Sequence, residues 1–217
     1  MNARLITFEG IEGSGKTVVA KETCRALEGA GVSVVLVREP GGTVVSERIR
    51  AILLDPARKE MATRAELFLY LASRAQLVSE VIRPALARGR SIVCDRYMDA
   101  SVAYQGWARG LGEQLVEKLN AVAVGDAVPE KTFLLDCAVA EGLGRGPTRR
   151  EKEGIAPRDR LEREDVSFHE KVREGYLRIA RREKKRFVVI DASRSLEDVF
   201  DAVFGNLEKL FSVRLVR

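Results

Sequence analysis

Five short runs of apolar residues recur along the chain, and longer stretches with helical spacing separate them. The runs occupy residues 5–8, 32–37, 91–94, 132–135 and 187–190. Each run is continuous rather than alternating, which is typical of strands buried on both faces of a parallel sheet. The longer stretches repeat apolar residues every three or four positions. They predict helices over 18–30, 46–54, 63–88, 113–124, 166–182 and 196–211. The pattern therefore predicts an α/β fold with a five-stranded parallel sheet and helices on both faces.

A few polar residues and prolines mark the expected helix boundaries. Ser46 is a plausible N-cap for the second helix, which Asp55-Pro56 should end. Thr63 and Glu66 have the spacing of a capping box at the start of the third helix. Pro84 cannot donate to the preceding turn, so it should kink or divide that long helix. The polar stretch that follows the third strand, up to Gly112, has no predicted element.

The stretch Gly10-Ile11-Glu12-Gly13-Ser14-Gly15-Lys16-Thr17 lies between the first predicted strand and the first helix. It fits the phosphate-binding pattern Gly, four free positions, then Gly-Lys-Ser/Thr. Its glycines let backbone N–H groups turn inward, and the helix that follows adds unpaired N–H groups and a positive dipole end. Lys16 offers a cation to the terminal phosphates, and the Thr17 hydroxyl is a ligand for magnesium. The stretch predicts a nucleotide site.

Charged residues follow the predicted strands at the edge where parallel sheets bind ligands. They are Glu9, Arg38, Glu39, Asp95, Arg96, Asp136 and Asp191. With Arg74 on a helix, the arginines are numerous enough to hold a second phosphate facing the first. Phosphoryl transfer needs such neutralisation, because it is catalysed by positioning. Taken alone, an arginine is more often a surface ion-pair residue, and Arg96 is the best exception because it directly follows a buried strand.

Composition and charge exclude several other classes. With 217 residues, 46% of them hydrophobic, the chain is long enough for one well-cored domain. No apolar run approaches a membrane span, and residues 1–4 leave no room for a signal peptide. Cys24, Cys94 and Cys137 are widely spaced in apolar segments, which predicts buried thiols in a reducing cytoplasm.

Three further observations narrow the possible chemistry. His169 is the only histidine, which argues against a Ser-His triad or a histidine metal centre and favours a structural role. No guanine-selecting Asn-Lys-x-Asp stretch is present. The net charge of +5 calls for anionic partners. The basic residues gather at strand ends and in one loop rather than along a stripe with aromatics, so a nucleic-acid-binding module is disfavoured.

Several motifs in sequence order resemble those of bacterial thymidylate kinases, and the resemblance runs through almost the whole chain. The motifs are FEGIEGSGKT (8–17), REPGGT (38–43), YLASRAQ (70–76), DRY (95–97) with SVAYQG (101–106), DRLE (159–162) and IDAS (190–193). The resemblance implies a three-layer P-loop NTPase fold and a single nucleoside monophosphate kinase domain over 1–217, with a short lid at about 142–160. It also implies phosphorylation of dTMP to dTDP with ATP and Mg²⁺, a step in dTTP biosynthesis, by a cytoplasmic homodimer.

The resemblance also implies a set of dTMP-binding residues. They are Glu12, Arg38, Tyr70, Arg74, Arg96, Ser101, Tyr104 and Gln105. Glu12 would accept a hydrogen bond from the 3′-hydroxyl, since a carboxylate among phosphates is costly without a partner. Tyr70, where the family commonly has Phe, shares a helix face with Arg74 and would stack on thymine or simply pack in the core. Tyr104 would exclude a 2′-hydroxyl.

The catalytic roles implied by the resemblance fall on Lys16, Asp95, Arg96 and the lid. ATP would bind over residues 10–17, and Thr17 and Asp95 would hold the metal. Because the phosphate-binding loop lacks an arginine, the lid should supply one to the transferring phosphoryl group. Arg149 or Arg150 is the expected residue, with Arg158 as the alternative.

Two other functions stay open at this point. One is the same reaction on another nucleotide, as in a uridylate, adenylate or deoxynucleotide kinase; Tyr70, Tyr104 and the REPGG turn disfavour it. The other is a nucleotide-binding regulator without transferase activity, which Lys16, Arg96 and the basic lid disfavour. The apolar faces of 64–86 and 113–124 allow the implied homodimer without proving it.

Overall fold

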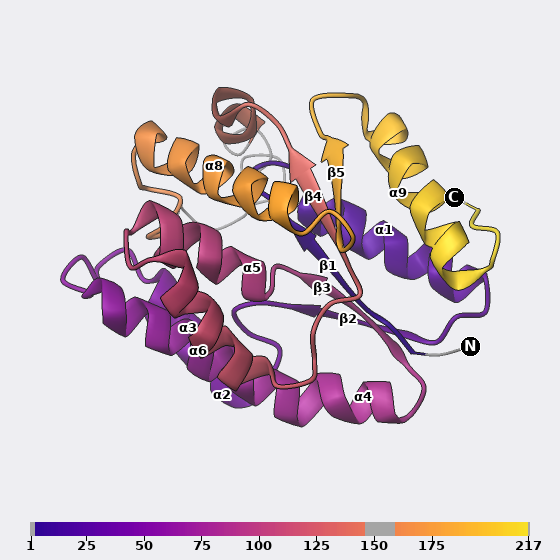
Figure 1. Ribbon diagram of the computed structural model, residues 1–217, viewed down its shortest axis with the longest axis horizontal. Helices are drawn as coiled ribbons and strands as arrows, with labels where there is room; N and C mark the ends of the chain where they lie inside the picture. The colour runs from indigo at the N-terminus through magenta and orange to yellow at the C-terminus, as the bar shows by residue number, and fades with distance from the viewer. Residues whose placement is uncertain (1–2, 146–158, 217) are drawn as a thin grey trace.

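The computed structural model describes residues 3–145 and 159–216 (Figure 1). Within them, all the strands form one parallel sheet in the order β2-β3-β1-β4-β5. The strands are β1 (Leu5–Glu9), β2 (Val34–Arg38), β3 (Ser91–Asp95), β4 (Lys131–Asp136) and β5 (Phe187–Asp191). The predicted α/β fold with five parallel strands is confirmed, because continuous apolar runs do mark strands covered on both faces.

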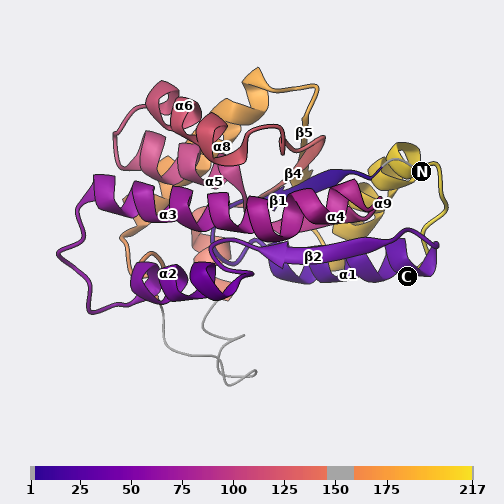
Figure 2. The same ribbon diagram turned by 90° about the horizontal axis from the view of Figure 1, so that it is seen from below.

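Helices cover both faces of the sheet, as Figures 1 and 2 show. They are α1 (Lys16–Gly29), α2 (Val44–Leu54), α3 (Thr63–Leu77), α4 (Arg83–Ala87), α5 (Met98–Ser101), α6 (Glu113–Val124), α8 (Val166–Arg182) and α9 (Leu196–Phe211). In Figure 2, β2 lies between α1 on one side and the continuous helical segment that includes α3 and α4 on the other. No helix in the described ranges is both long and apolar enough to cross a membrane.

The start of α2 differs from the prediction by two residues. The N-cap is Thr43, whose side chain accepts a hydrogen bond from the Ser46 N–H at 3.1 Å. Ser46 as N-cap was therefore wrong: it lies inside the helix, buried, and its hydroxyl donates to the Ser73 carbonyl at 2.9 Å. Val44 and Val45 precede it in the first turn, and Asp55 ends the helix as predicted.

The predicted capping box of α3 is also wrong. The N-cap is Ala62 and makes no side-chain hydrogen bond. Glu66 instead turns inward and is fully buried, with Gln105 and Arg109 among its partners. Buried charged and amide donors bind a carboxylate more strongly than a helix N–H that water can reach, so the tertiary contacts win.

Two segments of π-helix mark places where the helical pattern changes. Val78–Ile82 forms one of them between α3 and α4, directly ahead of Pro84. The proline thus divides the regular α-helix as predicted. The second, Val102–Ala108, continues α5 through the stretch that had no predicted element. That helix was missed because its buried residues include Ser101 and Gln105, which are polar and carry no apolar periodicity.

The register of the sheet brings the charged strand ends to one edge. Asp95 of β3 lies opposite both Phe8 of β1 and Arg38 of β2. On the other side, Asp136 pairs with Asp191. Since all the strands run in the same direction, the phosphate-binding loop and these charges share one end of the sheet, where ligands bind in such folds.

Candidate active site

A pocket of about 360 Å³ opens at the carboxyl ends of the strands. Its wall contains all eight residues predicted to contact dTMP: Glu12, Arg38, Tyr70, Arg74, Arg96, Ser101, Tyr104 and Gln105. Gly13, Lys16, Thr17 and Asp95 line it as well. Of the loop residues, Gly10, Ile11, Ser14 and Gly15 do not line it. The fold therefore brings the predicted acceptor residues against the predicted phosphate-binding loop.

The conformation of the phosphate-binding loop is fixed by hydrogen bonds to its own backbone and by the close approach of Gly142. Gly15 adopts a positive φ of 92° as the N-cap of α1. The Lys16 ammonium donates to the Ile11 carbonyl at 2.6 Å and to Ser14 Oγ at 3.3 Å. A Cβ at Gly13 would lie 1.8 Å from the Gly142 carbonyl oxygen, so only glycine fits this approach. Burial, and then the charge of Arg96, lower the Lys16 pKa to about 8.

Thr17 and Asp95 meet at the base of the loop. The Thr17 hydroxyl donates to Asp95 Oδ2 at 2.6 Å. A hydroxyl and a carboxylate are hard oxygen ligands of the kind that Mg²⁺ prefers, with phosphate oxygens and water completing its shell. No cluster of three or more His, Cys, Asp or Glu that could hold a metal occurs in the described part of the chain. The oxygen pair thus fits an ion that reaches the site together with phosphates.

Glu12 forms the centre of the acceptor side. Its Oε1 accepts hydrogen bonds from Arg96 Nη2 at 2.8 Å and from the Tyr104 hydroxyl at 2.6 Å. The Arg96 guanidinium also lies over the Tyr104 ring. Burial by itself raises the pKa of Glu12, but Arg96 and the other donors around it hold that pKa well below its usual range. Glu12 is therefore an ionised carboxylate at neutral pH.

Arg96 occupies an uncommon backbone conformation for a residue with a side chain, with φ of 65°. Its N–H donates to the Phe8 carbonyl at 3.0 Å, which ties the turn to β1. Its guanidinium donates to the Gly10 carbonyl at 3.0 Å and to the Tyr176 hydroxyl at 3.2 Å. These hydrogen bonds hold the strained turn in place, and they position the Arg96 guanidinium between the phosphate-binding loop and the pocket.

Arg74 is fully buried and its guanidinium is bonded to protein groups. Nε donates to Glu39 Oε2 at 2.7 Å, and Nη2 donates to the Tyr97 carbonyl at 3.0 Å. Nη1 donates to Ser101 Oγ at 3.0 Å and to Asn120 Oδ1 at 2.6 Å. Burial lowers the Arg74 pKa, but the Glu39 charge outweighs it and leaves the pKa raised. Arg74 lines the pocket as predicted, and its hydrogen bonds join α3 to the turn that follows β3.

Arg38 and Arg50 form a second cationic edge, and sequence reasoning missed Arg50. Arg38 donates to the Pro40 carbonyl at 3.2 Å and pairs with Glu47. Arg50, on α2, donates to the same carbonyl at 2.7 Å and lines the pocket. Burial, and then neighbouring Arg38, lower the pKa of Arg50. The available signal was the helical spacing of Glu47 and Arg50 just after the REPGG turn, which puts both on one face.

The described end of the predicted lid, and the residues just after it, also contribute to the site. Asp159, Leu161 and Glu162 line the pocket, although the sequence suggested no role for them. Arg160 Nε donates to the Leu53 carbonyl at 2.9 Å, and its Nη2 lies 2.6 Å from Glu66. This end of the segment is therefore anchored on α2 and α3. Arg149, Arg150 and Arg158, the candidate catalytic arginines, lie outside the described residues.

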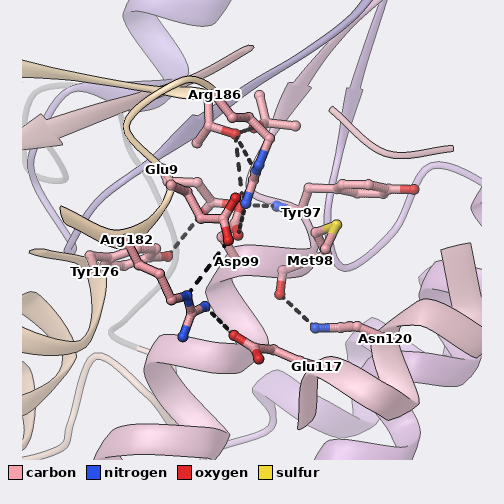
Figure 3. Close-up of polar contacts among 12 residues, drawn as sticks. Glu9, Tyr97, Met98, Asp99, Glu117, Asn120, Tyr176, Arg182 and Arg186 are labelled. Atoms are coloured by element: carbon pink, nitrogen blue, oxygen red, sulfur yellow. Dashed lines mark hydrogen bonds and ion pairs between the residues drawn. The ribbon is translucent and has the colours of Figure 1, made fainter. Parts of the chain in front are cut away.

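Behind the pocket lies a second buried carboxylate, Glu9 (Figure 3). Its Oε1 accepts from the Tyr97 N–H and its Oε2 from the Tyr176 hydroxyl, each at 2.7 Å. Asp99 lies nearby in a bidentate pair with Arg186 at 2.6 and 2.9 Å. Burial, and then the like charge of Asp99, raise the pKa of Glu9 to about 8. Glu9 is therefore mostly protonated at neutral pH.

Comparison with known proteins identifies one family. A family model described as "Thymidylate kinase" matches residues 8–203. A thymidylate kinase of Solidesulfovibrio magneticus is 50% identical over 94% of this chain and 99% of that protein. One from Geobacter sulfurreducens is 48% identical over 91% and 93%. The crystal structure of the Ehrlichia chaffeensis thymidylate kinase superposes with a TM-score of 0.76 at 30% identity, covering 96% of this chain and 99% of that one.

Proposed function

The chain belongs to the thymidylate kinase family, and we propose that its pocket binds dTMP against the phosphate-binding loop that holds ATP. As a member, it is an ATP-dependent kinase that phosphorylates dTMP to dTDP in dTTP biosynthesis. One observation carries the assignment of the site: the eight predicted dTMP-binding residues line the same pocket as Lys16 and Thr17. Two phosphate groups placed there would face each other across a short distance.

In this proposal, cations on both sides neutralise the two phosphates. Arg96, Arg38 and Arg50 face the acceptor phosphate from three elements, and Lys16 faces the transferring phosphoryl group. The acceptor phosphate is already an anionic nucleophile, so no base is needed. Bringing two anions together is the main barrier, and preorganised cations in a partly closed pocket lower it.

The nucleoside would lie along the helical wall of the pocket. Tyr70 offers a ring for stacking on thymine, and Gln105 and Ser101 lie near the base. Tyr104 closes the position of a 2′-hydroxyl, which favours a deoxynucleotide. Glu12 accepts a hydrogen bond from the 3′-hydroxyl, and its low pKa keeps it an acceptor. A matched substrate pair tests this: 3′-deoxy-dTMP should lose efficiency against dTMP with the wild type and not with Glu12→Ala, which has no side-chain acceptor.

Thr17 and Asp95 would hold Mg²⁺, which when bound neutralises charge on the ATP phosphates. The lid at about 142–160 would add Arg149 or Arg150 to the transferring group. Replacing both by alanine should lower turnover far more than dTMP affinity. Unchanged turnover would move the role to Arg158.

We also propose a homodimer of one cytoplasmic kinase domain spanning 1–217. Phe68 on α3 is 57% exposed and Val122 on α6 is 84% exposed, on the helices that the sequence suggested for the interface. Burying such apolar groups is the usual driving force for association. The free, buried cysteines suit a reducing compartment. Phe68→Asp together with Val122→Asp should give monomers in light scattering, whereas a wild type that is itself monomeric would refute the dimer.

An assay of ADP release across monophosphates tests the substrate assignment. We expect much faster turnover of dTMP than of UMP or AMP. Lys16→Ala should reduce turnover by about two orders of magnitude or more, because it removes a cation at the developing charge. Circular dichroism would check that the variant folds. Faster turnover of UMP or AMP than of dTMP would contradict the proposal.

A further inference from the structure

The single histidine of the chain lies against the carboxylate of Glu12. His169, on α8, is 0% exposed, and its Nδ1 is 3.1 Å from Glu12 Oε2. The Nδ1–H direction is not aligned with that oxygen as a full hydrogen bond requires. Among the described residues, neither ring nitrogen of His169 forms a hydrogen bond, and Glu12 Oε2 accepts none.

The two oxygens of Glu12 have different surroundings, and this difference makes the contact important. Oε1 accepts hydrogen bonds from Arg96 and Tyr104, which both line the pocket. Oε2 is buried away from solvent. Because Glu12 is ionised, a buried oxygen without a donor carries a large desolvation cost. His169 Nδ1 is the polar atom placed to relieve it.

We propose that His169 is a positioning residue for dTMP binding. Its Nδ1–H donates to Glu12 Oε2, and this bond holds Oε1 toward the pocket. His169 does not itself line the pocket, so it acts through Glu12 rather than on the substrate. The inference rests on the proposed role of Glu12 at the 3′-hydroxyl.

The helix that carries His169 supports the loop at two more points. Arg173, four residues on, pairs with Asp136 at the end of β4, and Tyr176 bonds to Glu9 and Arg96. Residues 169, 173 and 176 have the spacing of one helix face. That face meets three strand ends with polar side chains, so His169 belongs to a continuous support of the site and not to an isolated packing position.

One direct test reads the proton on the imidazole. Because the chain has one histidine, a tag-free, ¹⁵N-histidine-labelled enzyme gives a single set of ring signals. We expect Nδ1 to be protonated, and we expect its proton signal to move upfield in Glu12→Gln, where the acceptor loses its charge. An unprotonated Nδ1, or a signal unchanged in Glu12→Gln, would overturn the proposal.

A kinetic test separates positioning from packing. His169→Leu should lower kcat/KM for dTMP by roughly 10- to 100-fold, the effect of leaving one buried carboxylate oxygen without a donor. KM for ATP should stay within about 2-fold, since Glu12 then fails only toward the acceptor. His169→Asn, whose amide nitrogen can occupy the place of Nδ1, should recover most of the loss. His169→Gln, whose amide reaches the place of Nε2, should not. Equal activity of these two variants would contradict the proposal.

Two further variants separate a packing role of α8 from positioning, and the role of Glu12 from that of His169. Ile179→Val removes a buried methyl group elsewhere on α8 and should lower the melting temperature without changing the dTMP kinetics. In a Glu12→Gln background, His169→Leu should cost less than about 3-fold, because coupled residues are not additive. If Glu12→Gln itself leaves dTMP kinetics unchanged, the proposed role of Glu12 fails. If Glu12→Gln weakens dTMP use and His169→Leu does not, only the inference about His169 fails.

Discussion

Glu9 ends β1 and is fully buried, and the side chain of Glu12, in the loop just after it, is only 13% exposed. The surroundings of these two acids drive their ionisation in opposite directions. Glu9 contacts the Tyr97 N–H and the Tyr176 hydroxyl, and Asp99 is its charged neighbour. Glu12 contacts Arg96 and Tyr104 directly. As a result, the pKa of Glu9 rises to about 8, whereas that of Glu12 falls well below its usual range.

The difference shows what decides the charge of a buried acid. Burial raises both pKa values, so burial alone does not distinguish them. The direct ion pair with Arg96 at 2.8 Å helps to outweigh burial at Glu12. At Glu9, Arg96 is linked through the Tyr176 hydroxyl, and its charge lowers the pKa by less than burial and Asp99 raise it. The site thereby keeps one permanent negative charge facing the pocket and one neutral acid behind it. The ionised Glu12 can accept a hydrogen bond from a substrate hydroxyl, whereas the neutral Glu9 holds Tyr97 and Tyr176 in place behind the pocket.

Removing Arg96 should have the largest effect on dTMP kinetics, because Arg96 is what keeps the pKa of Glu12 below that of Glu9. In Arg96→Met, Glu12 loses its partner and the acceptor phosphate loses a cation. Removing one preorganised group that stabilises developing charge costs about 10²- to 10³-fold in turnover, so kcat/KM for dTMP should fall by a similar factor. Arg25→Met, an exposed site on α1, is the matched control and should behave like wild type. A loss below tenfold in Arg96→Met would be inconsistent with this explanation.

Neutralising each acid separately should give unequal effects. Glutamine resembles a protonated carboxyl group, so at pH 7 Glu9→Gln should change kcat/KM for dTMP by less than about 3-fold. Glu12→Gln removes an ionised acceptor, and we expect a loss of about 10- to 100-fold. Steady-state kinetics on the two variants make the comparison. Equal losses would mean that both acids, or neither, are ionised.

Removing the hydroxyl partner of each acid should separate the two acids again, this time in the free energy of unfolding in urea. Tyr104→Phe deletes a bond to an ionised carboxylate, which is worth about 1.5–3 kcal/mol. Tyr176→Phe deletes a bond to a neutral acid, worth about 0.5–1.5 kcal/mol. Both rings stay in place as packing groups. A larger loss in Tyr176→Phe would reverse the assignment of the two charges.

Much of this arrangement could be predicted from the sequence. Continuous apolar runs identified the parallel strands, and the spacing of glycines, Lys16 and Thr17 identified the loop. Because parallel strands end at one edge, the charges that follow them were expected to gather there, and Asp95 does meet Thr17. The family resemblance then named the acceptor residues, which share one pocket.

The remaining features depend on contacts between distant segments, which local patterns do not specify. Glu66 fits a capping box in sequence, but it is drawn inward by Arg109 and Arg160, which are distant in the chain. His169 was expected to be structural, and no pattern links it to Glu12. Nothing in the spacing of Glu9 and Glu12 distinguishes their charges, because the distinction comes from the ion pair of Glu12 with Arg96 and from the nearness of Asp99 to Glu9.

The pH dependence of stability tests the opposite ionisation of Glu9 and Glu12 most directly. The folded-state pKa of Glu9 is raised from 4.5 to about 8, so its stabilising contribution is complete below pH 4.5 and is lost as pH rises through 8. Glu12 has a lowered pKa, so its contribution is present above the unfolded value and is lost only in acid.

The measurement is urea unfolding of wild type, Glu9→Gln and Glu12→Gln between pH 5 and pH 9. We predict that the stability of wild type relative to Glu9→Gln falls across this range by up to about 1.4 kcal/mol per pH unit, then levels off above pH 8. The stability of wild type relative to Glu12→Gln should stay constant over the same range. A Glu9→Gln difference that is independent of pH would show that Glu9 is ionised like Glu12 and would contradict the account.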